Sequence, residues 1–150
     1  MTKTPRDPHF EARVRDSFAR QRAMATLGIT MGRVVPGEVD LEVPYREDLT
    51  QQHGFLHAGV IATMADSACG YAAFSLMAAD VGVLSVEFKI NLLAPARGQR
   101  FVARARVLRA GRTLSVCAAD VVAVDGTQET AIAALQATIM AIAGRADVQH

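Results

Sequence analysis

Residues 51–77 read QQHGFLHAGVIATMADSACGYAAFSLM and become almost uniformly apolar after His57. Apolar residues would surround a helix here on most sides, which is typical of a helix buried in a core. A run of about 20 apolar residues could also cross a bilayer. Thr63, Asp66 and Ser67 interrupt the run and a strand-rich pattern follows it. We therefore expect a buried helix, and no membrane partner.

A narrow stripe of small and polar residues runs along this predicted helix. Gly59, Thr63, Asp66 and Gly70 follow one another at spacings of four, three and four, so they share one face. A carboxyl group on an apolar helix is unfavourable unless it is paired, hydrogen-bonded or used in chemistry. Asp66 therefore has two interpretations, a structural pair or a reactive group.

Length and composition narrow the function classes. A chain of 150 residues fits one domain. With 16 Lys and Arg against 15 Asp and Glu, the net charge gives no signal for a nucleic acid partner. A hydrophobic content of 51% is high and indicates a buried subunit interface. Residues 1–22 lack the apolar segment of a secretory signal, so we expect a cytoplasmic protein. Cys69 and Cys117 lack metal or redox spacing and are expected to be reduced core residues.

The flanking sequence predicts one short helix and six strands. Apolar residues at four-residue steps predict an amphipathic helix over 9–24, and a tail that frays is expected from Gly144. Alternating residues and turn signals predict a hairpin before the long helix and a four-strand meander after it. The predicted strands cover 26–31, 38–43, 81–93, 100–108, 113–124 and 129–142.

Apolar and polar residues alternate strictly in the first strand after the helix, which predicts one apolar and one polar face of that strand. One face is expected to carry the apolar side chains and the other to carry Ser85 with Glu87 and Lys89. The apolar set is Leu84, Val86, Phe88, Ile90 and Leu92. The fold class is therefore α+β, with an antiparallel sheet of about six strands wrapped around one long central helix and an extra N-terminal helix.

This architecture, with HGFLHAGVIATMADSA at 53–68 and SVEFKINLLAPARG at 85–98, resembles the hotdog-fold acyl-CoA thioesterases of the phenylacetate-pathway (PaaI-like) subfamily. The resemblance covers about residues 25–142. It implies a single hotdog domain over 1–150, with 1–24 as a helical extension. It also implies hydrolysis of acyl-CoA to free acid and CoA, without metal or organic cofactor, in a homodimer that pairs into a tetramer.

The resemblance further implies roles for individual residues. The amide of Ala58, at a position where the family usually has glycine, polarises the thioester carbonyl. Asp66 of a neighbouring subunit attacks or activates water. Gln51, where relatives commonly have Asn, supports the carbonyl, and Ser85 matches a residue that orients water. Gly59, on the stripe, allows close approach.

Helix geometry supports a site divided between subunits. Residues 58 and 66 are eight apart, which is about 12 Å along a helix axis. A reacting carbonyl must lie roughly 3 Å from both its oxyanion donor and its nucleophile. One helix cannot supply both groups, whereas two antiparallel helices around a two-fold axis can.

The remaining candidates each keep two interpretations. His57 either hydrogen-bonds its own loop or stiffens the turn that presents Ala58, and His53 with Gly54 shapes the same turn at the substrate. No cluster suggests a metal site. Arg109 and Arg112 belong either to a solvated sheet face or, through the resemblance, to a seat for the CoA phosphates. Tyr71, Phe74 and Met77 line an acyl tunnel or form core, and core is favoured.

Two other functions stay open at this point. Some hotdog domains bind acyl-CoA without catalysis, and others hydrate enoyl thioesters. Asp66 on a buried stripe argues against a pure binding module. A hydratase would need an Asp/His pair across the double bond, for which His57 is the near candidate. A thiol-release assay on acyl-CoA substrates separates the three functions.

Overall fold

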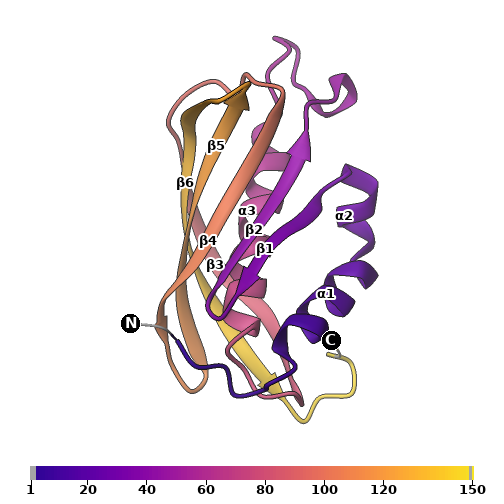
Figure 1. The fold of residues 1–150 in the computed structure, drawn as a ribbon, viewed down its shortest axis with the longest axis vertical. Helices are drawn as coiled ribbons and strands as arrows, with labels where there is room; N and C mark the ends of the chain where they lie inside the picture. The colour runs from indigo at the N-terminus through magenta and orange to yellow at the C-terminus, as the bar shows by residue number, and fades with distance from the viewer. Residues whose placement is uncertain (1–2, 149) are drawn as a thin grey trace.

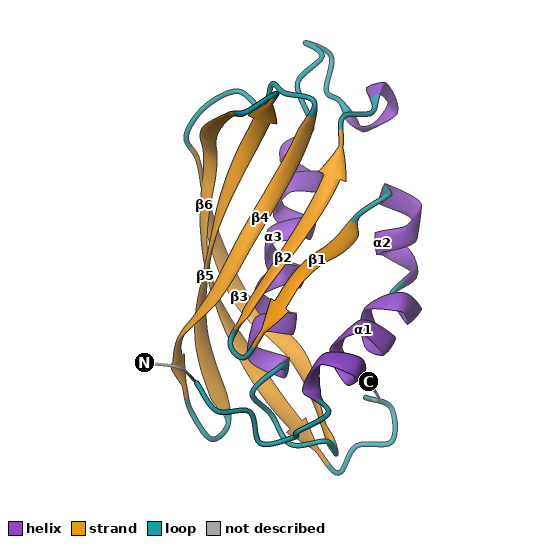
Figure 2. Ribbon diagram, in the orientation of Figure 1, coloured by secondary structure: helices purple, strands orange, loops and turns teal. Residues whose placement is uncertain are grey.

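The computed structural model describes residues 3–148 and 150 of the chain. A sheet of six antiparallel strands curves around one side of a long helix, and two short helices lie on the helix's other side (Figures 1 and 2). The elements in chain order are α1 (Phe10–Arg20), α2 (Arg22–Leu27), β1 (Thr30–Val35), β2 (Glu38–Pro44), a 3-10 turn (Glu47–Leu49), α3 (Ala58–Phe74), β3 (Val81–Leu92), β4 (Arg100–Ala110), β5 (Leu114–Asp125) and β6 (Gln128–Ala143). The predicted hotdog architecture is confirmed.

The strands do not follow one another in space as the predicted meander did. Their order in the sheet is β1-β2-β4-β5-β6-β3, so β3 pairs with β6 and forms an edge of the sheet. α3 crosses the face of the sheet after β2 and delivers the chain to the far edge, where β3 begins. β4, β5 and β6 then fill the space between β2 and β3, which makes β3 the second edge strand.

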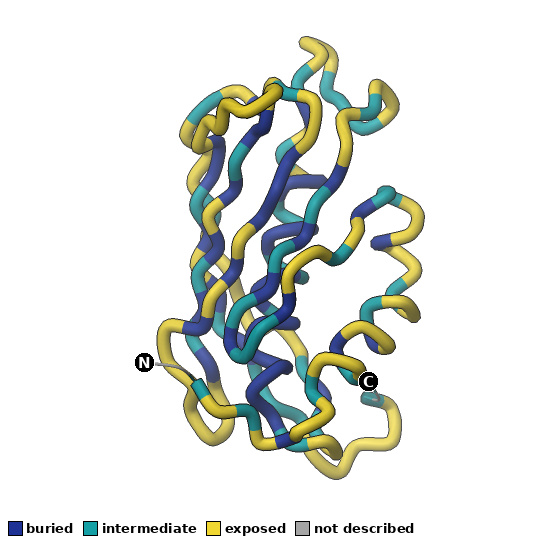
Figure 3. The backbone as a smooth tube through the Cα atoms, in the orientation of Figure 1, coloured by how far each residue is buried: buried dark blue, intermediate teal, exposed yellow. Residues whose placement is uncertain are grey.

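α3 buries one face against the sheet and leaves another face accessible. Small side chains on the buried face let the backbone lie close to the strands. Figure 3 shows the buried residues as dark blue stretches of α3 and of the strands. The fully buried residues of this face include Met64, Ala65, Ala68, Cys69 and Ala72. The predicted stripe lies on the other side, since none of Gly59, Thr63, Asp66 and Gly70 is buried.

A β-bulge at Val86 changes the two faces of β3. Ser85 pairs with Ile139 and Glu87 pairs with Thr138, so Val86 is an extra residue without a partner. The bulge reverses the alternation, so Val83 and Ser85 before it share the core-facing side with Phe88 and Ile90 after it, whereas Leu84 lies on the other side. The predicted alternation, with all five apolar side chains on one face and Ser85 beside Glu87, is therefore wrong.

The N-terminal region contains two helices instead of the one predicted over 9–24. The chain is extended at Gln21, and α2 runs on to Leu27. Gly28 then adopts a left-handed φ of 72°, which ends α2 and delays the first strand to Thr30. The strand predicted over 26–31 is therefore corrected, although the β1–β2 hairpin itself is confirmed.

The end of α3 is held by Arg13 of α1. One guanidinium nitrogen donates to the Phe74 and Met77 carbonyls at 3.3 and 2.8 Å, and another donates to Asp7 at 2.8 Å. These bonds satisfy carbonyls that a helix end leaves without partners. The burial of Tyr71, Phe74 and Met77 confirms the favoured core interpretation.

The chain after Gly144 folds back, contrary to the predicted frayed tail. The His150 ring lies 4.9 Å from the Phe74 ring, and its Nδ1 lies 3.1 Å from Ser17 Oγ. Its Nε2 accepts a 3.0 Å hydrogen bond from the Val83 amide, which belongs to the edge strand β3. The tail therefore covers the beginning of that edge.

The two cysteines are buried and free, as predicted. Burial raises the pKa of both thiols, that of Cys117 to about 12. In the described part of the chain, no helix is long and apolar enough to cross a membrane.

Candidate active site

The start of α3 offers a backbone amide that has no partner. His57 caps the helix, and its Nδ1 accepts a 2.8 Å hydrogen bond from the Gly59 amide. The Ala58 amide, one residue earlier, donates to no group among residues 3–148 and 150. An amide in this position carries partial positive charge and faces whatever approaches the helix start. No non-glycine residue described has a positive φ, so alanine at position 58 causes no backbone strain.

The hydrogen bond between His57 and Gly59 explains why these two residue types occur at the start of α3. A side chain at Gly59 would place Cβ 3.0 Å from His57 Nδ1, so glycine leaves room for the imidazole. His57 hydrogen-bonds within its own turn, which was one of its two interpretations. Because Nδ1 accepts this hydrogen bond, a neutral His57 ring carries its proton on Nε2.

Hydrogen bonds between residues of the loop before α3 hold the loop in a tight turn. Gln51 Oε1 accepts a hydrogen bond from the His53 amide, and the Gly54 amide donates to the Gln51 carbonyl at 3.0 Å. Gly54 has a left-handed φ of 81°, which the turn requires. Gln51 and Ala58 line one cavity of about 440 Å³, which Leu92 and Leu93 of the β3 end also border.

Asp66 lies two helical turns further along, in a second cavity of about 200 Å³. Ser85 Oγ donates a 2.8 Å hydrogen bond to Asp66 Oδ1. Burial raises the pKa of the Asp66 carboxyl, and the Ser85 hydrogen bond opposes that rise. Asp66 forms no salt bridge within the described residues. The structural interpretation of Asp66 as half of an ion pair therefore has no partner to support it.

The two cavities share no lining residue. Both open along β3, one beside Ser85 near the strand's beginning and the other beside Leu92 at its end. One copy of the chain therefore carries an amide without a carboxylate at one place, and a carboxylate without a free amide at another.

Arg109 and Arg112 line neither the Ala58 cavity nor the Asp66 cavity. Both are exposed at the hairpin between β4 and β5, and only Arg112 lines any cavity described below. The neighbouring Arg104 and Arg106 form surface ion pairs with Glu129 and Asp120, as expected for a solvated sheet face. In the described residues no group of three His, Cys, Asp or Glu side chains is placed to hold a metal ion.

Sequence reasoning missed the polar wall of the Asp66 cavity. Gln21, in the break between α1 and α2, donates to Ser67 Oγ at 3.3 Å and accepts from the Tyr71 hydroxyl at 3.3 Å. His150 borders the same cavity. No motif marks these residues, because only tertiary packing brings the N-terminal helices and the tail to α3.

Comparison with known proteins decides the family. The model of the family described as "Thioesterase superfamily" matches residues 53–130, which contain α3 and the end of the loop before it. A putative esterase of Halobacterium salinarum is 35% identical over 66% of this chain and 68% of its own length. The chain belongs to the thioesterase superfamily. The human acyl-coenzyme A thioesterase 13 is 34% identical over 61% of this chain and 66% of its own length.

Solved structures agree with this membership. A thioesterase family protein from Silicibacter pomeroyi is 56% identical, with a TM-score of 0.88 over 90% of this chain and 99% of that one. The E. coli PaaI protein of the phenylacetic acid degradation operon has a TM-score of 0.81 over 90% of this chain and 94% of that one, at 19% identity, and shares the fold. The family model and the relatives confirm the predicted thioesterase membership and the assignment as a thioester hydrolase, and the likeness to PaaI confirms the predicted hotdog fold.

Proposed function

We propose that this thioesterase superfamily member hydrolyses acyl-CoA thioesters to the free acid and CoA at a site shared between two copies. The observation that carries the proposal is the separation of Ala58 and Asp66 into two cavities of one copy. Eight helical residues place the two groups about 12 Å apart along α3. A thioester carbonyl can contact both groups only if a second copy supplies one of them.

The open edge of β3 supports a second copy in this position. Leu84, Phe88 and Leu92 are 48%, 44% and 56% exposed, and an exposed apolar edge strand is a template for pairing with another chain. Antiparallel pairing about a two-fold axis at Lys89, with Val86 unpaired in each copy, would place residue 85 opposite residue 92 of the second copy. The Asp66 cavity of one copy would then meet the Ala58 cavity of the other.

The chemistry follows from this juxtaposition. The thioester oxygen accepts a hydrogen bond from the Ala58 amide, which stabilises the negative charge that develops on that oxygen. The Asp66 carboxylate either attacks the carbonyl carbon or takes a proton from the attacking water. The carbon–sulfur bond then breaks and CoA leaves as a thiolate. With Asp66 as general base, the thiolate takes up the proton that Asp66 removed from water. With Asp66 as nucleophile, water hydrolyses the mixed anhydride, which releases the free acid, regenerates the carboxylate and supplies the proton for the thiolate. Ser85 orients the carboxylate. Gln51 lines the same cavity as Ala58, and we assign its Nε2 as a second donor.

The substrate class rests on relatives and on charge. The human relative named above is an acyl-coenzyme A thioesterase, and the CoA moiety carries phosphates that Arg binds well. We assign Arg109 and Arg112 to these phosphates, and His53 with Gly54 to the loop at the substrate. In this proposal residues 1–150 form one hotdog domain, two copies form the active dimer, and dimers pair into a tetramer.

The two alternative functions have less support from the geometry. A hydratase needs a second acid–base group, and His57 Nδ1 is already occupied by the hydrogen bond that the Gly59 amide donates. The Asp66 carboxyl is half-buried, accepts a hydrogen bond from Ser85 and has no cationic partner within the described residues. A module that only binds acyl-CoA would not need such a group.

Asp66→Asn tests the proposal, with Asp80→Asn, an exposed aspartate in the loop before β3, as the matched control. Loss of a general base should lower kcat for thiol release by about 10²–10⁴-fold. Burial raises the Asp66 pKa above its unfolded value, so the charged carboxylate weakens folding at neutral pH, and Asn removes that penalty. The variant should therefore melt at or above the parent temperature. A variant that melts early but turns over normally would show that Asp66 is structural.

A further inference from the structure

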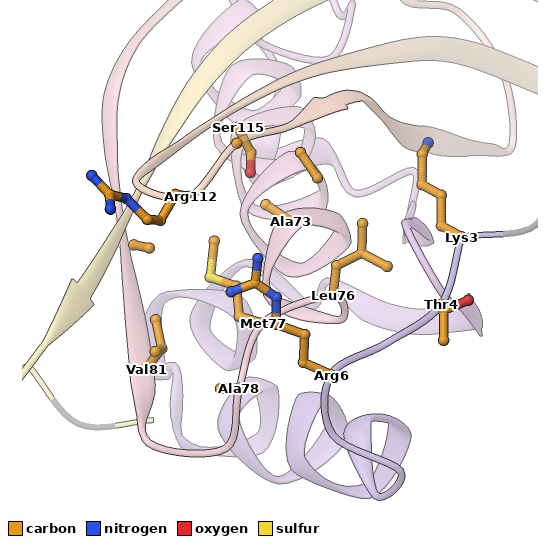
Figure 4. Close-up of a pocket in the computed structure, with 13 residues that line it drawn as sticks. Lys3, Thr4, Arg6, Ala73, Leu76, Met77, Ala78, Val81, Arg112 and Ser115 are labelled. Atoms are coloured by element: carbon orange, nitrogen blue, oxygen red, sulfur yellow. The ribbon is translucent and has the colours of Figure 1, made fainter.

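A third cavity lies at the far end of α3, separate from both halves of the proposed site. It has a volume of about 300 Å³ and shares no lining residue with the other two cavities. Its floor is apolar and consists of Ala73, Leu76 and Met77 from the end of α3 and the following turn, with Val81 from β3 (Figure 4). This volume lies at the lower end of the range for small-molecule sites.

Ser115 provides a polar group inside this cavity. The residue is only 3% exposed, and its hydroxyl forms no hydrogen bond with any residue that the structure describes. Figure 4 shows the Ser115 oxygen directed into the cavity. The hydroxyl oxygen is open to the cavity, because Arg13 Nη1 is the one fully buried side-chain polar atom without a partner in the described residues. A group that fills the cavity can therefore accept a hydrogen bond from Ser115.

Arg6 provides a cation above the same floor. The Arg6 amide donates to the Leu76 carbonyl at 3.4 Å, which ties this segment to the end of α3. The Arg6 guanidinium has no carboxylate partner in the described part of the chain, and the neighbouring Asp7 is bonded to Arg13. Figure 4 shows the guanidinium of Arg6 turned into the cavity.

The other two cations that line the cavity are placed differently. Lys3 Nζ donates to the Val107 carbonyl, and Figure 4 shows the Arg112 guanidinium turned away from the cavity. One guanidinium and one hydroxyl therefore face the apolar floor. Both groups are hydrogen-bond donors that a carboxylate can accept from, and Arg binds carboxylates through directed hydrogen bonds.

We propose that this cavity binds a small organic acid with an apolar body, with its carboxylate on Arg6 and Ser115 and its body over Leu76 and Met77. The inference goes beyond the proposed hydrolysis, because it adds a ligand site outside the proposed active site. A released acid belongs to the same chemical class, so a product could occupy this second site. The proposal is tested by binding alone and does not depend on the enzyme's activity.

The test is a titration with octanoate, followed by NMR of the ¹³C-labelled methionine methyl groups and by calorimetry. Met77 borders the cavity and Met64 is fully buried elsewhere on α3, so the Met77 signal should move and saturate while Met64 stays still. Met77→Leu assigns the signal. 1-Octanol, which has the same chain without the charge, should bind about tenfold more weakly or worse.

Variants separate this site from other binding. Arg6→Gln should raise the octanoate Kd by about tenfold or more and Ser115→Ala by about two- to tenfold, whereas Arg22→Gln, at an exposed arginine outside the cavity, should leave it unchanged. The melting temperature of each variant shows that it is folded. An octanoate response at Met77 that Arg6→Gln does not weaken, no response at Met77, or displacement of octanoate by 3′,5′-ADP would each overturn the proposal.

Discussion

Ser85 Oγ and Asp66 Oδ1 are 2.8 Å apart, and the hydrogen bond between them joins the edge strand β3 to the accessible face of α3. The contact depends on the bulge at Val86, since strict alternation would have kept Ser85 on the same face as Glu87. The bulge therefore turns a serine from the polar face of the strand towards the candidate carboxylate.

Removing this hydrogen bond should change the pH dependence of the enzyme. In Ser85→Ala, burial still raises the Asp66 pKa while the opposing hydrogen bond is gone, so the pKa rises further. Because the reactive carboxylate is lost as pH falls through this pKa, the acid limb of kcat/KM should move to higher pH. At neutral pH kcat should fall by about two- to tenfold. Ser67→Ala, in the same cavity, is the control, and an unmoved acid limb in Ser85→Ala would argue against the assigned base.

Ala58→Pro should remove the oxyanion donor and leave the fold intact. Proline is favoured at the first residue of a helix, and His57 has φ −64° and ψ 136°, which suit a residue before proline. The substitution replaces the amide proton with the ring Cδ, so the donor is lost and kcat should fall by at least about 10²–10³-fold. Melting curves check the fold. Full activity in a folded Ala58→Pro variant would show that another group holds the carbonyl oxygen.

Arg109→Ala and Arg112→Ala should weaken CoA binding. Phosphate contacts far from the reacting carbon bind substrate and transition state alike, so KM should rise by about tenfold while kcat stays nearly constant. A truncated thioester without the nucleotide should show no difference between variant and parent. Unchanged KM values for both variants would place the nucleotide elsewhere.

Phe88→Glu should disrupt pairing at the β3 edge. A carboxylate beside the centre of the proposed pair would lie opposite the apolar residue 90 of the second copy and would have to be desolvated. We expect sedimentation to show monomers and thiol release to fall by at least about tenfold. Leu108→Glu alters an exposed leucine on β4 and should affect neither measurement. An active Phe88→Glu monomer would contradict the shared site.

The sequence predicted the elements that depend on local pattern. Apolar residues all round 58–74 indicated the central helix, and their spacing placed Asp66 and Thr63 on one face of α3. The turn at Gly126 and the strands on either side of it also followed from local signals. These features depend only on residues that are close together in the sequence, so the sequence alone was sufficient to predict them.

Features set by distant contacts were not predicted. The position of β3 at the sheet edge depends on how α3 crosses the sheet, and the bulge at Val86 has no local marker such as glycine. The length of α2 depends on the left-handed conformation of Gly28, which was instead interpreted as part of an alternating strand. Gln21 and His150 reach α3 only through tertiary packing.

The most direct measurement of the shared site combines two inactive variants. Ala58→Pro and Asp66→Asn are produced separately and also co-expressed with different tags, and thiol release from an acyl-CoA is measured on the purified mixed dimer. If the site joins Ala58 of one copy to Asp66 of the other, the mixed dimer contains one intact site of two. A random co-expressed mixture should then recover about one quarter of the parent kcat, and the purified mixed dimer about one half. If the mixed dimer is no more active than the two variants alone, the amide and the carboxylate belong to the same copy and the account is wrong.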